Sequence, residues 1–178
     1  MKVRAIFFGV LLAMFGQIYA SEISTYVDGS KPFIAIKDVN RQGEAWAACS
    51  ATYDIIARLL GETPAQSQQL KDRANGAKLA VGMTLVLEDL DSDISPERFN
   101  ALWTFAKVAI DAWPEIQRNA ILADAESLSS EGAEGSNKFV DKLIATVKIC
   151  KSNLESQQMY IDVWRAFAKS GMLKVAED

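Results

Sequence analysis

Residues 44–60 read EAWAACSATYDIIARLL, and their apolar side chains recur every three or four positions. This spacing places them on one face of an α-helix. Gly61 follows directly, and glycine is typical of the residue that ends a helix. The stretch therefore predicts an amphipathic helix with Trp46, Cys49, Tyr53, Ile56 and Leu60 on one face.

Two dipeptides predict the starts of the next helices. Thr63-Pro64 and Ser95-Pro96 each place a capping side chain before a proline, which is favoured at the first helical position. Pro114 should kink the second of these helices, because it removes a backbone hydrogen bond. The expected helices cover residues 64–90 and 96–128.

The last apolar stripe keeps its spacing from residue 136 to residue 169, which favours one long helix. Two helices hinged near Asn153 are the alternative. Residues 129–135, SSEGAEG, predict a flexible loop before this stripe. Long helices joined by short links predict an all-α fold, an up-and-down bundle of four to five helices.

Residues 1–20, MKVRAIFFGVLLAMFGQIYA, have the layout of a secretory signal peptide. A short apolar run follows Lys2 and Arg4, and Ala20 provides the small residue at the cleavage site. The run is too short for a stable membrane span. We therefore expect a signal peptide over 1–20, an extended arm over 21–39 with apolar anchors at Phe33, Ile34 and Ile36, and a helical domain over 40–178. The mature chain should be soluble, and periplasmic or secreted.

Cys49 and Cys150 are the two cysteines of the chain. A secretory signal directs the protein to an oxidising compartment, so a structural disulfide between them is expected. The chain has no histidine, which excludes triads built on histidine, histidine-ligated zinc and histidine-held haem. No cofactor and no metal site are expected.

The cysteine pair predicts how the first and last helices meet. Cys49 lies near the start of the first helix and Cys150 lies well before the end of the last, so the last helix should extend past its neighbour. The overhanging side chains would be covered either by the arm or by a partner protein. These side chains are Tyr160, Trp164 and Phe167.

The turn that contains Asp89, Asp91 and Asp93 has the first ligand spacing of a calcium-binding EF-hand loop. Ile94 stands where that loop needs glycine, and Asn100 where it needs a bidentate glutamate. We therefore interpret the turn as an acidic surface, and as a second candidate contact for a partner.

Two alternatives to protein binding are open. Gly76 and Gly82 lie inside a helix, and together with Trp103 and Trp113 they could line a pocket for a small apolar ligand. Close helix packing is the plainer interpretation of the glycines. A carboxylate-dependent hydrolase would need two paired acids across a cleft, and nothing in the spacing pairs the three candidates, which are Asp54, Asp111 and Asp162.

The leading hypothesis is an exported protein that binds another protein, as an inhibitor, an immunity-type protein or an envelope-complex subunit. It is not expected to be an enzyme. Loss of the signal would change the net charge from −4 to −6, because two positive side chains leave with it. This acidic balance argues against nucleic acid and anionic membranes as partners, and it suits a basic protein.

Overall fold

The computed structural model describes residues 25–61, 64–90 and 95–173, and within these ranges all regular structure is helical. The predicted signal peptide, the predicted Thr63 cap, Asp91 and Asp93 lie outside the described residues. A single 3₁₀ turn, η1, precedes five α-helices. Their bounds are η1 Phe33–Ala35, α1 Val39–Leu59, α2 Pro64–Glu88, α3 Pro96–Ser129, α4 Ala133–Ser152 and α5 Leu154–Lys169.

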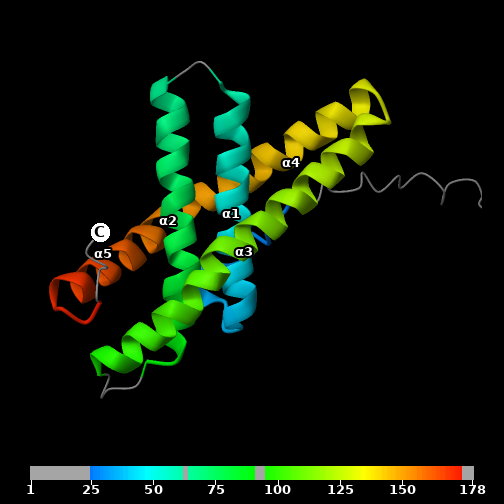
Figure 1. Cartoon of the computed structure of the whole chain (residues 1–178). Coiled ribbons are helices and arrows are strands. Elements are labelled where there is room, and N and C mark those ends of the chain that lie inside the picture. Colours follow the sequence, from blue (N-terminus) through cyan, green and yellow to red (C-terminus); the bar gives the residue numbers. More distant parts are fainter. Residues whose placement is uncertain (1–24, 62–63, 91–94, 174–178) are drawn as a thin grey trace, which may run out of the picture.

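The helices form a bundle built around one hairpin. The antiparallel pair α1–α2 is crossed obliquely on one side by α3 and on the other by α4 and α5 (Figure 1). The all-α bundle expected from the sequence is therefore confirmed. The first and last helices were expected to lie side by side, but α1 instead meets α4 at a crossing and α2 packs on α5.

The disulfide lies at the crossing of α1 and α4. Cys49 and Cys150 are joined, with their Cα atoms 5.7 Å apart, and both are buried. This separation is usual for a disulfide. The pairing expected from the sequence is confirmed, and it links the central hairpin to the α4–α5 layer.

The core is centred on the second half of α2. Ala77, Ala80, Val81 and Met83 have no exposed surface, because this segment faces α1, α3 and α5. Trp46 and Tyr53 of α1 are equally buried. Burial raises the pKa of Tyr53 to about 12, so its hydroxyl stays neutral over the physiological range.

Several local predictions are confirmed at single residues. The Ser95 side chain accepts a hydrogen bond from the backbone N–H of Arg98, which caps α3. Gly61 has a positive φ of 46° just after α1, which is a conformation that glycine adopts readily. Pro114 is buried inside α3, so the helix runs through the proline as expected, while its kink stays a prediction.

Three expected boundaries are wrong. α1 begins at Val39 rather than at Glu44, since Asp38 caps it. The loop expected over 129–135 shrinks to a tight turn, with α3 ending at Ser129 and α4 beginning at Ala133. The single long helix favoured at the end of the chain is wrong, and the alternative is confirmed: two helices meet at Asn153.

Asn153 breaks the last helix because its side chain bonds elsewhere. Its Oδ1 accepts a hydrogen bond of 2.8 Å from the backbone N–H of Phe33, and its Nδ2 donates to the carbonyl of Ile149. An asparagine side chain that competes with the helical backbone favours a helix end. The hinge between α4 and α5 is therefore also the point where the N-terminal arm contacts the bundle.

The arm docks through Phe33, as the sequence predicted. The Phe33 ring is fully buried and meets the Trp46 indole edge to face, with ring centroids 4.8 Å apart. Gln42 donates a hydrogen bond to the Phe33 carbonyl. Ile36 is partly buried, whereas Ile34 is 49% exposed and is not an anchor.

A second anchor of the arm joins it to α3 and α4. The Tyr26 hydroxyl donates to Asp124, which also binds the Lys142 ammonium at 2.7 Å. The backbone N–H of Tyr26 donates to the Thr146 hydroxyl. Burial and the neighbouring carboxylate raise the pKa of Tyr26 above its ordinary value, so the hydroxyl remains a donor.

None of the described helices is long and apolar enough to cross a membrane.

Candidate functional site

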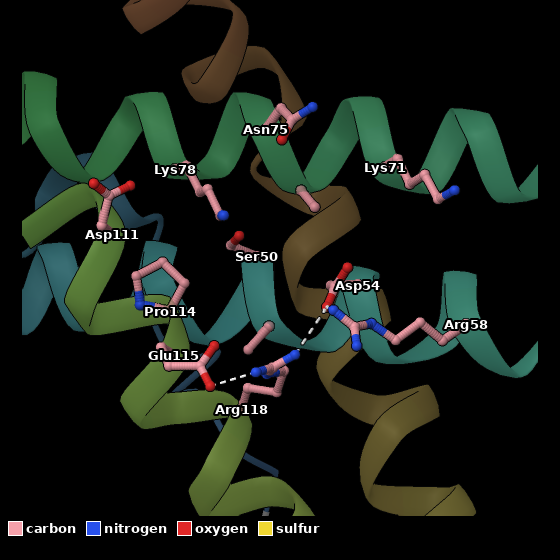
Figure 2. Close-up of a pocket in the computed structure, with 12 residues that line it drawn as sticks. Ser50, Asp54, Arg58, Lys71, Asn75, Lys78, Asp111, Pro114, Glu115 and Arg118 are labelled. Atoms are coloured by element: carbon pink, nitrogen blue, oxygen red, sulfur yellow. Dashed lines mark hydrogen bonds and ion pairs between the residues drawn. The ribbon is translucent and has the colours of Figure 1, made fainter. Parts of the chain in front are cut away.

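A polar hollow of about 290 Å³ lies where α1, α2 and α3 meet (Figure 2). Four of its side chains carry positive charge and three carry negative charge. The oblique crossing of α3 creates this space, because α3 diverges from the hairpin instead of filling the groove between α1 and α2. The lining residues are Ser50, Ala51, Asp54, Arg58, Lys71, Ala74, Asn75, Lys78, Asp111, Pro114, Glu115 and Arg118.

The arginines of the hollow are held by carboxylates. Asp54 binds Arg58 at 2.9 Å and lies 4.0 Å from Arg118, while Glu115 binds Arg118 directly (Figure 2). The hydrogen bond to Glu115 raises the pKa of Arg118, so this guanidinium stays charged. Asp54 and Glu115 are thereby occupied by charges of the protein itself.

The two lysines of the hollow differ from the arginines. No carboxylate of the described residues lies within ion-pair distance of Lys71 or Lys78. They lie seven residues apart on α2, which places them on one face about 10 Å apart along the helix. Lys78 is half-buried and points toward Ser50 of α1 (Figure 2).

Ser50 brings a buried hydroxyl to the same place. It is 1% exposed, and its Oγ has no hydrogen-bond partner among the described residues. The Nε of Arg118 is likewise buried and unpartnered. Buried polar atoms are almost always hydrogen-bonded, so two such atoms in the walls of one hollow need an explanation.

The outer face of α3 is a different kind of surface. Phe105, Val108 and Ile116 are 71%, 67% and 61% exposed, and the exposed Ala112 lies between them. Steps of three and four residues place these side chains in one stripe along the helix. We call this set of four the α3 stripe.

A wider, open depression of about 660 Å³ runs beside the arm and α1, lined by residues that include Tyr26, Asp38, Arg41 and Gln117. Most of its lining residues belong to the arm. We therefore interpret the depression as the gap between the docked arm and the bundle, and not as a binding site.

The aromatic residues predicted to overhang α1 are instead packed inside the bundle. Tyr160 is buried against Trp46 and accepts a hydrogen bond from Gln42. The reason is the early start of α1, whose first two turns reach this end of α5. The rings of Trp164 and Phe167 lie against Trp103 and Phe99 of α3, at 6.4 and 4.6 Å between centroids.

In the acidic turn, Asp89 is exposed and its carbonyl accepts a hydrogen bond from Arg98. Asp91 and Asp93 lie outside the described residues. Among the residues that are described, no group of three or more potential metal ligands comes together.

The glycines expected to line an apolar pocket mark close helix packing instead. A Cβ at Gly76 would collide with Gln157, and one at Gly82 would collide with Ile110 and lie 3.3 Å from Trp103. Trp113 lies over Gly43 of α1 in the same way. Protein side chains therefore fill the space that an apolar ligand would need beside these glycines.

The three candidate acids are not arranged as a hydrolase pair. Asp54 and Asp111 both line the hollow, but Asp54 is held by two arginines. Asp162 is exposed on α5 and pairs with Arg165 at 3.2 Å. Asp54 therefore has a structural role in positioning Arg58 and Arg118.

Sequence reasoning had missed Ser50, Lys71, Lys78 and Arg118. The sequence did contain a signal for the lysines. They are seven residues apart in one helix, so they share a face, and Lys78 is a charged residue beyond the polar first half of that helix. Nothing in the sequence placed α3 opposite them.

No family model, no curated protein and no solved structure matches this chain.

Proposed function

We propose that this protein is exported and acts by binding another protein, and that the α3 stripe is its docking surface. The observation that carries the proposal is the exposure of Phe105, Val108 and Ile116 in one line. Clustered exposed apolar side chains are unfavourable in water, and on soluble domains they commonly mark interaction sites. A straight apolar stripe on a helix suits a partner that presents a helix or an apolar groove.

Charge favours a different protein over a second copy as the partner. The chain carries a net charge of −4, so two copies repel each other when they approach. Asp111 and Glu115 are exposed beside the α3 stripe, and basic side chains at the rim of a partner would complement them. Inhibitors, immunity-type proteins and envelope subunits all act through such surfaces.

A photo-crosslinking amino acid at position 105 is expected to form one specific adduct with a protein of the extracellular or envelope fraction. The same amino acid at position 59 is the control, because Leu59 is 70% exposed and is the last residue of α1, an end that lies away from α3 (Figure 1). Unlabelled wild-type protein should abolish the adduct. The variant with Phe105→Ser and Ile116→Ser should compete at least about tenfold less well, since central apolar side chains dominate protein interfaces.

Equal labelling from positions 105 and 59, or equal competition by the double variant, would contradict this surface. An adduct with twice the mass of the chain would show self-association and would contradict a heterologous partner. Thermal unfolding of the double variant should match that of wild type, because the replaced side chains are exposed.

Export has its own expected result. The protein recovered outside the cytoplasm should begin near Ser21, and its intact mass without reductant should be 2 Da below that of the dithiol form. Intact-mass spectrometry of the secreted and periplasmic fractions measures both. Recovery of the chain only inside the cell, with residues 1–20 retained, would refute export.

A further inference from the structure

We propose that the hollow between α1, α2 and α3 binds a small molecule through an oxyanion group, a carboxylate or a phosphate, held by Lys78 and the Ser50 hydroxyl, with Lys71 adding positive charge at the far end of the hollow. This proposal does not depend on protein binding by the α3 stripe. Asp111 and Glu115 border both surfaces, but the side chains that carry each proposal differ, Phe105, Val108 and Ile116 for the stripe and Lys78 and Ser50 for the hollow, so each can fail alone.

The first argument is the charge left over in the hollow. Asp54 and Glu115 are occupied by Arg58 and Arg118, whereas the two lysines have no carboxylate within ion-pair distance in the described part of the chain. Lys78 is half-buried and has lost part of its hydration, which an anion would compensate, whereas Lys71 is exposed. The positive excess is local, because the whole chain is acidic.

The second argument is the buried hydroxyl. Ser50 Oγ is a hydrogen-bond donor without an acceptor, and the side chain of Lys78 points toward it (Figure 2). An oxyanion seated between them would accept from both the hydroxyl and the ammonium. Hydrogen bonds that involve a charged group are roughly twice as strong as neutral ones.

The third argument concerns size and orientation. A volume of about 290 Å³ admits a small metabolite but not a folded chain. Asp111 stands at the edge of the same hollow without an ion-pair partner among the described residues. Its carboxylate would repel a second negative charge and would favour a ligand with a single anionic group, or one that also carries an amine.

The test uses heteronuclear NMR titration of the oxidised mature protein with sodium acetate and, separately, inorganic phosphate at constant ionic strength. We expect saturable shifts of the Ser50, Lys71 and Lys78 amide signals, with a Kd in the millimolar range or tighter for at least one anion. A carboxylate ligand would give the tighter acetate curve, and a phosphate ligand the tighter phosphate curve.

Matched variants separate a site from general charge attraction. Lys78→Gln should weaken binding about tenfold and Lys71→Gln by less, while Lys148→Gln removes the same charge from an exposed position on α4 and should leave the Kd unchanged. Ser50→Ala should weaken binding by roughly three- to tenfold without lowering the thermal stability, because the hydroxyl has no partner to lose.

Two results would overturn the proposal. One is the absence of saturable shifts in the hollow with either anion up to about 50 mM, well above the expected Kd. The other is an equal effect of Lys148→Gln and Lys78→Gln, which would show screening of the general charge only.

Discussion

Replacing both cysteines, as Cys49→Ala with Cys150→Ala, is expected to lower the free energy of unfolding by about 2–5 kcal/mol. The bond joins residues 101 positions apart, and closing so long a loop restricts the unfolded chain strongly. The chain-entropy model gives about 4.7 kcal/mol for a loop of this length. The bond also fixes α4 onto the central hairpin at a buried crossing. Urea unfolding followed by circular dichroism measures the change.

Reduction of the wild-type protein provides the control for the lost side-chain volume. Wild type in excess reductant should lose a similar amount of stability, whereas reductant should leave the double variant unchanged. A loss below about 1 kcal/mol in both experiments would mean that packing alone holds α1 against α4, in conflict with the expected effect of so long a loop.

The second large effect is expected from Phe33→Ala, which should cost about 3–5 kcal/mol. The ring is fully buried against Trp46, and the backbone of the same residue bonds to Asn153 and Gln42. Loss of the ring leaves a cavity at the point where the arm, α1 and the α4–α5 hinge meet. The arm should then detach before the bundle unfolds.

Limited trypsin digestion detects that detachment. In Phe33→Ala, cleavage after Lys37 should become much faster than in wild type; Lys31 is not a trypsin site, because Pro32 follows it. Ile34→Ala is the matched control, because the neighbouring side chain is 49% exposed and its loss should cost under about 1 kcal/mol. Similar cleavage and stability in the two variants would contradict the role of Phe33 as the anchor.

Features that depend on a few neighbouring residues were predictable. Ser95 caps α3, Gly61 follows the end of α1, and Pro114 lies within α3 as expected. Each reflects backbone chemistry within one helical turn. The disulfide was also predictable, because two cysteines allow a single intramolecular pairing.

Features that depend on distant residues were not predictable. The apolar spacing runs through Asn153, yet the helix breaks there because the arm, 120 residues earlier in the chain, supplies a backbone donor to its side chain. Tyr160 was expected to overhang the first helix, but Trp46 and Gln42, at the start of that helix, cover it. From the sequence alone, Gly82 could line a ligand pocket or allow close helix packing. Only the position of Ile110 against it shows that it allows close packing.

Hydrophobic periodicity, helix caps and the cysteine count were thus enough to predict the helices, their approximate ends, the all-α bundle and the disulfide. These properties follow from interactions within a few residues or from a pairing with one solution. The oblique crossing of α3 over the α1–α2 hairpin was decided by tertiary packing alone. That crossing opens the hollow, brings Arg118 to Asp54 and leaves Lys78 facing Ser50. Side chains on three helices share a site only after those helices have packed, and helix spacing carries no information on the angle at which they cross.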